Sequence, residues 1–560
     1  MKNLRLYKFS FLLSFIFLLS SCGLDSMVSK FNTLEFKVTP KQVEVHAGNI
    51  EIELEVKIPE KYFQKTAEAD FRAVLAKSND SESKVFFDPI KLQGEKISSN
   101  GKTIGYVTGG SFIYKSSLKY NKKMADYSLF VNAIASINNN SKNLGTIKVA
   151  DGVMATSTRV KSDEVPALAD HTYEKITVLE ETATIYFTVN QSNVRYSQKS
   201  SEDIKRLKEF AKLGYETKNI EISSYASPEG SLDINDKVSD NRSESTFNYA
   251  KRLMKKLKIE GANNNDKYIK TSRGEDWAGF NSLVNTSNMK DKNKVLNIVR
   301  NQKDPQKREE AIRDMAEIYD AIEDDVLPKL RKATITLRLY EPKKNDEEIV
   351  SLVVDNPIQL DIKEMLYAAT LIEDITIKKT IYNTIINAFP NDFRAYNNLA
   401  TLYINEKNIN MAIDMLGKAS KLNEKSYEVM ENKGIIAAME GDYSKARSLY
   451  NKSNASLVNK GILDIKTGDY SSASSKLTGN DYNSTLAKLM NGENPDATTD
   501  MTADGAYLNS IVHARNGDFD RSIRFLSKAI QMNPSYKEEA AKDFEFKNLS
   551  ENDRFQKLVN

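Results

Sequence analysis

The sequence predicts a multidomain α+β protein with an N-terminal β-sandwich, a central β/α sandwich and a C-terminal α-helical superhelix. At 560 residues the chain is longer than one hydrophobic core supports. Short alternating strands fill the part before residue 160, and helical periodicity with a recurring turn fills the part after residue 361. With 28% charged and 40% hydrophobic residues, the composition is typical of soluble globular domains.

The charge and the metal-binding residue types limit the classes of function. The net charge of +3 is close to balance, so no basic footprint for nucleic acid is present. The single cysteine and the three distant histidines, His46, His171 and His513, give neither a disulfide framework nor metal-ligand spacing. We therefore expect no cofactor, no metal and no nucleic-acid partner.

Residues 1–21 have the pattern of a targeting segment. Basic residues precede the apolar run Phe9–Leu19, which is shorter than the roughly 20 residues of a membrane span. The following Leu19-Ser-Ser-Cys22-Gly23 resembles a bacterial lipobox. The resemblance implies lipid on the Cys22 thiol, and several acyl chains give a stable anchor. The alternative is a secreted protein whose signal happens to contain a cysteine.

The lipobox resemblance also implies a location. A lipid at Cys22 predicts attachment to the outer membrane of a Gram-negative bacterium. After the cysteine stands one acid, Asp25, rather than the acidic run that some bacteria use for surface export. The absence of such an acidic run favours a protein that faces the periplasm.

Residues 32–160 are predicted to form the β-sandwich. In Asn49–Ile58 the apolar residues occupy alternate positions, which indicates a half-buried antiparallel strand. Turn clusters separate several further short strands, as in a sandwich. These strands are predicted at 33–38, 71–75, 103–106, 128–133 and 145–149. Their charged outer faces are either solvated faces that protect edge strands or an interaction surface. Residues 157–174 follow as a polar connector.

A strand, a loop and a helix are predicted around residues 220–257. Ile220 and Ile222 alternate with polar residues, and Pro228 with Gly230 ends the strand. Apolar residues then recur at helical spacing, with Arg242 expected in the first turns of the helix. A guanidinium that faces the loop would suit a carboxylate, because its planar fork pairs with two oxygens.

This stretch resembles the OmpA-like peptidoglycan-associating domain. The family's loop Gly, Asn, Leu-Ser and Arg correspond to Gly230, Asn235, Val238-Ser239 and Arg242. In that family a loop Asp and the helix Arg hold the diaminopimelate of the wall peptide. Ser227 replaces this Asp, and Glu229 could supply a nearby carboxylate. The candidate peptidoglycan-binding residues are Arg242, Asn235, Ser239, Ser227, Tyr225 and Glu229. The alternative for Arg242 is a surface or packing arginine.

The resemblance extends over residues 175–341. Alternating strands at 184–188, 268–271 and 333–339 and a helix at 203–213 predict a β/α sandwich with helices on one face. Residues 281–325 depart from the family, because their helical spacing predicts an inserted helical pair. This insertion could cover the wall-binding groove or lie on the far side.

A charged linker at 342–348 is predicted to lead to helical repeats at 361–560. Residues 392–425 span 34 positions and resemble a tetratricopeptide repeat in Leu399, Ala400, Tyr403 and the residues that follow. A Gly-Asp-aromatic turn recurs at Gly441, Gly468 and Gly517, and residues 453–502 are degenerate. Such repeats stack into a superhelix whose concave face binds peptides or proteins.

The sequence gives no support for catalysis. There is no Gly-rich phosphate loop, and Gly109-Gly110-Ser111 lacks the second glycine of a nucleophile elbow because Ile113 stands there. We therefore expect a protein that is not an enzyme.

The domain order resembles that of lipoproteins of the Bacteroidota. One hypothesis is that the chain tethers the outer membrane, or a complex in it, to peptidoglycan and recruits protein partners through the repeats. The alternative is a periplasmic scaffold subunit of an outer-membrane assembly or secretion complex without wall binding. A third possibility is a surface-exposed binding protein.

Overall fold

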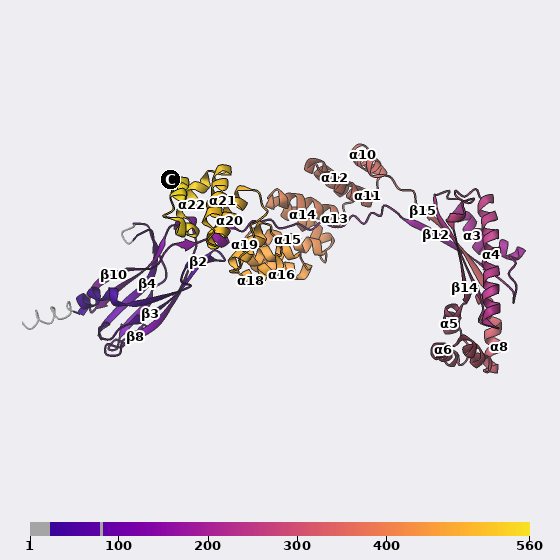
Figure 1. Ribbon diagram of the computed structural model, residues 1–560, viewed down its shortest axis with the longest axis horizontal. Coiled ribbons are helices and arrows are strands. Elements are labelled where there is room, and N and C mark those ends of the chain that lie inside the picture. The colour runs from indigo at the N-terminus through magenta and orange to yellow at the C-terminus, as the bar shows by residue number, and fades with distance from the viewer. Residues whose placement is uncertain (1–22, 79–81) are drawn as a thin grey trace, which may run out of the picture. The chain divides into compact units, whose positions relative to one another are not determined.

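The computed structural model describes residues 23–560 apart from 79–81, and apart from the side chains at 316 and 317. The predicted signal segment and Cys22 lie outside the described residues. The chain divides into two compact units (Figure 1): residues up to Asp170 together with Ile375–Asn560, and His171–Asp374. Across the described residues, no helix combines the length and the apolar character that crossing a membrane requires.

The first unit begins with two β-sheets that share one hydrophobic core. Within the described residues, the first sheet contains β1 (Glu35–Thr39), β2 (Val43–His46), β3 (Asn49–Ile58), β8 (Gly110–Lys119) and β11 (Val153–Met154). The second contains β4 (Ala67–Ala76), β5 (Lys84–Phe86), β6 (Ile90–Gly94), β7 (Lys102–Ile104), β9 (Ser128–Ile137) and β10 (Asn140–Ala150). Leu54 of β3 and Phe71 of β4 belong to the same buried cluster. The predicted β-rich N-terminal region is confirmed.

Sequence patterning located the strands unevenly. β3 has the predicted bounds, and its alternate residues are buried. β8 was missed, although Phe112 and Tyr114 point into the core, because serines and lysines dilute its pattern. β9 extends to Ile137, beyond its predicted end, and pairs along its length with both β4 and β10.

The C-terminal part of the first unit is an array of helices. They are α12 (Ile375–Ala388), α13 (Phe393–Asn405), α14 (Ile409–Leu422), α15 (Tyr427–Met439), α16 (Tyr443–Ser453), α17 (Leu457–Lys466), α18 (Tyr470–Lys476), α19 (Tyr482–Met490), α20 (Ala503–Arg515), α21 (Phe519–Met532), α22 (Ser535–Lys542) and α23 (Asp553–Val559). The recurring glycines Gly441, Gly468 and Gly517 have φ values of +84°, +80° and +74°. Glycine is favoured in this left-handed conformation, which ends the first helix of each pair. The predicted helical repeat region is confirmed.

The degenerate stretch is also explained by the structure. α18 has seven residues, and after α19 the chain runs without a helix until α20 begins at Ala503. Asn509 of α20 holds this passage, because its side-chain amide accepts from the Thr498 N–H and donates to the Thr498 carbonyl.

An arginine whose side chain is 15% exposed joins the sandwich to the last helices. Arg159 ends the short 3-10 helix Thr156–Arg159 that follows the last strand. One of its Nη atoms lies 2.5 Å from Glu539 Oε1 and 3.1 Å from Asp543 Oδ2. Its guanidinium carbon lies 4.0 Å from the ring centroid of Tyr507. These contacts fix the sandwich and the end of the helical array within one unit.

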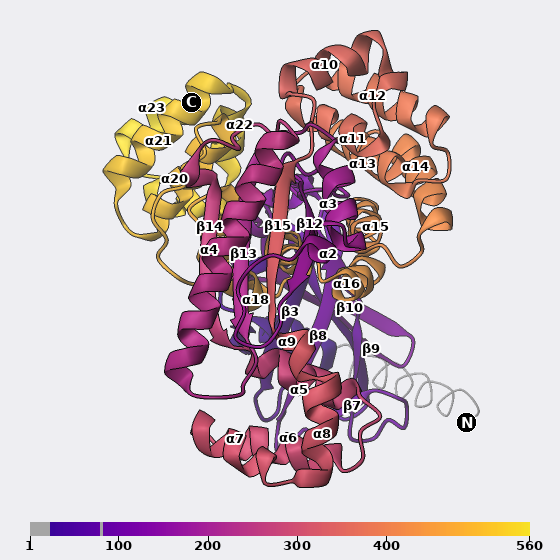
Figure 2. The ribbon, with the colours of Figure 1, turned by 90° about the vertical axis from the view of Figure 1, so that its right-hand side faces the viewer.

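The second unit contains a mixed sheet, all of it in described residues. Its strand order is β12 (Val178–Tyr186), β15 (Lys332–Tyr340), β13 (Thr217–Ala226) and β14 (Tyr268–Glu275). β13 and β14 are parallel, and the other pairs are antiparallel. Helices α3 (Glu202–Ala211) and α4 (Leu232–Lys256) cover one face of the sheet (Figure 2) and share its core. These are the elements predicted from the pattern, while the OmpA-like assignment stays a prediction.

Two predictions about helices in this unit are wrong. Over residues 277–330, where every backbone position is described, the expected helical pair is a run of short helices with its own core. They are α5 (Trp277–Thr286), α6 (Lys292–Asn301), α7 (Pro305–Arg313), α8 (Ala316–Asp325) and α9 (Leu327–Leu330). The Asp304-Pro305 pair forces one break, since Asp304 caps α7 and proline favours a helix start.

The second error concerns the expected linker at 342–348. α10 (Asp346–Asp355) begins inside it, because the Asn345 side chain caps the helix by accepting from the Glu348 N–H. α11 (Ile362–Leu371) follows behind a capping box formed by Asp361 and Glu364.

Candidate functional site

The first candidate site is the groove of the helical array. Asparagines that are almost fully buried project from four helices, and we call them the asparagine ladder: Asn398 of α13, Asn432 of α15, Asn459 of α17 and Asn483 of α19. In α15 and α17 a glycine, Gly434 or Gly461, follows two positions after the asparagine and packs closely on the next helix. Because two residues turn an α-helix by about 200°, the asparagine lies on the opposite face.

The ladder binds the main chain of the segment predicted as a polar connector. The Ala169 N–H donates to Asn398 Oδ1 over 2.8 Å, and the Ala169 carbonyl accepts from Asn398 Nδ2 over 3.1 Å. Ala167 makes the same pair of bonds with Asn432, both 2.8 Å long. Asn397 adds a 2.9 Å bond to the Ala167 carbonyl. Each ladder amide, at Asn398 and at Asn432, therefore satisfies both polar groups of one connector residue.

The same pairing continues along the array. Val165 pairs with Asn459 over 2.8 and 2.9 Å, and Lys161 pairs with Asn483 over 3.0 and 2.9 Å. The connector therefore runs antiparallel to the order of the repeats. The prediction of a polar connector therefore left out that this segment is bound in the groove of the repeats. A signal was present in the sequence, because Asn398, Asn432 and Asn459 each precede the small residue of their repeat by two positions.

One buried ion pair accompanies the ladder. Lys466 Nζ lies 2.5 Å from Glu164 Oε1, and these side chains are 8% and 2% exposed. Lys466 Nζ also donates to Ser162 Oγ over 2.9 Å. A buried charge is costly unless it is paired, so this lysine fixes where the glutamate lies.

The second candidate site is the predicted wall-binding loop in the second unit. Arg242 lies in the interior of α4 rather than in its first turns, because the helix already begins at Leu232. Its side chain is almost fully buried. Its Nε donates to the Gln191 carbonyl over 3.0 Å, and its Nη atoms donate to the carbonyls of Tyr225 and Thr188 over 2.8 and 3.2 Å. The guanidinium thus joins the loop after β12 to the end of β13.

The charge of this arginine is disfavoured by its surroundings. Burial, followed by the neighbouring charge of Arg331, lowers the pKa of Arg242 to about 10 against the opposing effect of Glu229. The face of the Phe187 ring lies 5.2 Å from the guanidinium carbon. This arrangement combines hydrogen bonding to three carbonyls with a cation–π contact.

The loop residues form an ion pair beside Arg242. Arg331 donates to both carboxylate oxygens of Glu229 over 2.7 and 2.9 Å, and Ser227 Oγ donates to Glu229 Oε1 over 2.7 Å. Burial raises the pKa of Glu229, but the hydrogen bonds from Arg331 and Ser227 outweigh it, so that the pKa lies below its ordinary value. Ser227, which was predicted to replace the loop Asp of the OmpA-like family, therefore supports an internal carboxylate.

The structure gathers most of the predicted residues at this loop. Asn235 Nδ2 donates to the Glu229 carbonyl over 3.1 Å and to Glu275 Oε1 over 2.8 Å. Tyr225 contributes its carbonyl to Arg242, and its ring lies 5.1 Å from Lys332 Nζ.

Ser239 has a different environment. It is fully buried, donates to the Ser224 carbonyl over 3.0 Å and accepts from Ser272 Oγ over 2.8 Å. Its hydroxyl therefore connects α4 to β13 and β14.

The helical insertion contacts the predicted wall-binding loop. The Gly230 N–H donates to Glu309 Oε1 of α7 over 2.8 Å, and Glu309 is buried and paired with Arg313. Gly230 has a φ of +93°, a conformation that favours glycine. Of the two placements considered, the structure supports an insertion that lies against the loop.

A pocket of about 530 Å³ opens beside this cluster. It is lined by Tyr186, Phe187, Thr188, Val189, Arg195, Pro328, Lys329 and Arg331. Among the described residues, the buried Arg195 Nε has no hydrogen-bond partner. Cationic groups next to an apolar wall suit a small ligand that carries a carboxylate.

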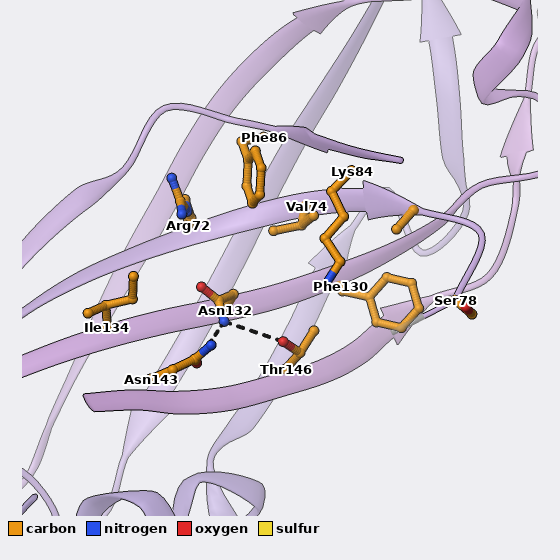
Figure 3. Close-up of a pocket in the computed structure, with 11 residues that line it drawn as sticks. Arg72, Val74, Ser78, Lys84, Phe86, Phe130, Asn132, Ile134, Asn143 and Thr146 are labelled. Atoms are coloured by element: carbon orange, nitrogen blue, oxygen red, sulfur yellow. Dashed lines mark hydrogen bonds between the residues drawn. The ribbon is translucent and has the colours of Figure 1, made fainter. Parts of the chain in front are cut away.

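A smaller pocket of about 160 Å³ lies on the outer face of the sandwich (Figure 3). Val74 and Phe130 form its apolar part, and the Arg72 guanidinium lies 4.2 Å from the Phe86 ring centroid. Asn132 Nδ2 donates to Asn143 Oδ1 over 3.0 Å. A cavity of this volume matches about one benzene ring.

Within the described residues, no cluster of His, Cys, Asp or Glu could hold a metal ion. Comparison with known proteins identifies one family: residues 393–426 match the tetratricopeptide repeat. The match covers α13 and α14, so a tetratricopeptide repeat is present in the C-terminal array. No curated protein matches the chain.

Solved structures with similar folds include several tetratricopeptide repeat proteins. YrrB, "a TPR protein with an unusual peptide-binding site", is 14% identical over 32% of this chain and 88% of its own, with a TM-score of 0.21. A tetratricopeptide repeat protein from Parabacteroides merdae is 15% identical over 57% of this chain and 93% of its own, with a TM-score of 0.20. PilW, a type IV pilus biogenesis factor, is 11% identical over 39% and 100%, with a TM-score of 0.20.

Proposed function

We propose that the chain is a non-enzymatic protein scaffold, attached to the outer membrane by lipid on Cys22 and facing the periplasm. Tetratricopeptide repeats serve protein interactions, and here the repeat array is combined with a β-sandwich in one unit. The observation that carries the proposal is the contact of Arg159 with Glu539, Asp543 and Tyr507. This contact holds the sandwich in a fixed place beside the helical array. A scaffold that offers both surfaces to the same assembly needs them in a fixed arrangement.

Co-purification from cell envelopes tests this proposal. The full chain is expected to bring down outer-membrane or periplasmic proteins after crosslinking, and Cys22→Ser is expected to move the chain from the membrane to the soluble fraction. A chain that stays monomeric and captures no protein would end the scaffold proposal. Unchanged membrane fractionation of Cys22→Ser would end the lipid anchor and leave the scaffold untouched.

Wall tethering is the second candidate, supported by the pocket next to Arg242. Arg195, Lys329 and Arg331 bring positive charge to this pocket, and one buried Arg195 nitrogen is unpaired among the described residues. A carboxylate of the wall peptide would match that charge. Binding there does not require Arg242 to leave its three carbonyls.

Sedimentation with purified peptidoglycan tests wall binding. Lys329 is exposed, so Lys329→Glu reverses a charge at the pocket without opening the core, and it is expected to reduce binding at least tenfold. Lys212→Glu, at an exposed position outside the pocket, is the matched control. Equal binding by wild type, Lys329→Glu and Arg242→Ala would remove both the pocket and the predicted clamp.

A further inference from the structure

We infer that the asparagine ladder is a receptor for peptide main chain and that residues 161–169 of the same chain are its resident ligand. While this segment is seated, the groove of the repeats is closed to extended peptides from partners. The inference deepens the scaffold proposal by saying which surface is unavailable to partners, but it uses only contacts within the first unit.

The spacing of the contacts shows that the backbone is what the ladder recognises. In an extended strand, the N–H and C=O groups of alternate residues point to the same side. Val165, Ala167 and Ala169 are alternate residues, and each pairs through both groups with one asparagine. A side-chain amide has a donor and an acceptor, so it pairs with a residue as a neighbouring strand would.

The residues between these contacts support the same conclusion. Pro166 has no N–H to donate, and it stands at a position whose polar groups alternate away from the ladder. The side chains of Val165 and Leu168 are 57% and 55% exposed, so the groove does not enclose them. Ala169 is buried, which restricts that position to a small side chain. The ligand class is therefore an extended peptide with a small residue at one end.

Glu164 fixes the register of the segment. The contacts step by two residues from Ala169 to Val165, and then by four residues to Lys161. The longer step coincides with the shortened helix α18. Glu164 lies within this step and pairs with the buried Lys466. A slip by one residue would turn this carboxylate to the opposite side and leave the lysine unpaired.

Two arguments favour a seated connector. The segment supplies a donor and an acceptor to each ladder amide, and emptying the groove would exchange these bonds for bonds to water. The segment is also covalently attached, which gives it an effective concentration in the millimolar range. A competing peptide that is free in solution must replace the bonds of the segment to the ladder and also exceed the effective concentration of the segment.

Proline substitutions in the full chain test the inference. Ala167→Pro together with Ala169→Pro removes two N–H donors that the ladder accepts, whereas Leu168→Pro removes an N–H that points away. The probe is a fluorescent synthetic peptide with the sequence of residues 161–170. We expect the double variant to bind it at least tenfold more tightly than wild type, and Leu168→Pro to behave as wild type. Equal binding by the three chains would overturn the inference.

Hydrogen exchange of the wild-type chain gives a second test that needs no variant. The amides of residues 165, 167 and 169 are expected to exchange at least a hundredfold more slowly than that of residue 168, because only the former are bonded to the ladder. Uniformly fast exchange over 162–170 would overturn the inference even if the double variant fails to fold. Neither result bears on whether the scaffold captures partners through another surface.

Discussion

The repeat groove and the predicted wall-binding loop both carry polar side chains of the kind that binds ligands, and in both the ligand is the protein's own main chain. The ladder asparagines pair with Ala169, Ala167, Val165 and Lys161. Arg242 donates to three carbonyls of its own domain, two in the loop after β12 and one in β13. The two regions differ in what is bound: the groove holds a separate segment of chain, whereas the arginine holds the backbone of the loop and strand that surround it.

This difference determines which site could exchange its occupant. Residues 161–169 can leave the groove without dismantling a helix, because ladder and segment belong to different elements. Arg242 cannot release its carbonyls without unlinking the loop at Thr188 from the end of β13 at Tyr225. A residue type at a family position therefore does not define a site until the atoms facing it are known.

The largest effect is expected for Arg242→Met. The substitution leaves three carbonyls without their donor, which should cost about 3 kcal/mol or more. For a unit of this size, that corresponds to a fall in Tm of about 6–12 °C in scanning calorimetry. Arg206→Met, whose side chain is 57% exposed, is the control with little expected change. A Tm like that of wild type would mean that the guanidinium is free for a ligand.

The next effect is expected for Asn432→Ala in the groove. It removes the bonds to both polar groups of Ala167 and to Asn397, at an expected cost of about 2 kcal/mol. Amides of the connector should then exchange faster with solvent, while those of the second unit keep their wild-type rates. Asn383→Ala on the exposed face of α12 is the control. Faster exchange in both units would contradict a local role for the ladder.

A smaller effect, with a defined pH window, is expected for Glu229→Gln. The pKa of Glu229 is depressed in the folded chain, so its ion pair with Arg331 stabilises the fold above the unfolded pKa of about 4.3. This contribution is lost as the pH falls through the folded pKa. Thermal unfolding between pH 7 and pH 3 should therefore be less pH-dependent in Glu229→Gln than in wild type. Parallel curves would show that the ion pair contributes nothing.

The sequence predicted the strands and helices whose residues are buried at regular intervals. The alternation in Asn49–Ile58 gave the bounds of β3, and the Gly-aromatic turns at Gly441 and Gly468 located the helix pairs. It failed where a polar residue sets the boundary, as at Asp304 in the insertion and Asn345 in the supposed linker. Caps of this kind are single residues without a periodic signal.

The sites were harder to predict than the fold, for a related reason. The resemblance identified Arg242 and Ser227 and brought them to one loop, but their partners are the carbonyls at residues 188, 191 and 225 and the Glu229 carboxylate. Carbonyls are present at every position, so no sequence pattern marks which of them will face a guanidinium. The ladder was missed because single asparagines 24–34 residues apart become one surface only after the helices stack.

The smallest effect sharpens the contrast between backbone and side-chain recognition. Leu168→Ser changes an exposed side chain of the connector and should alter the stability by less than about 0.5 kcal/mol. Ala169→Leu changes a buried position by a similar volume in the other direction and should cost about 1–3 kcal/mol through overpacking. Proteolysis within residues 161–169 measures both, since a seated segment is protected. If Leu168→Ser also exposed the segment to cleavage, binding in the groove would depend on the side chains of the connector. The inference that the ladder recognises the main chain would then be wrong.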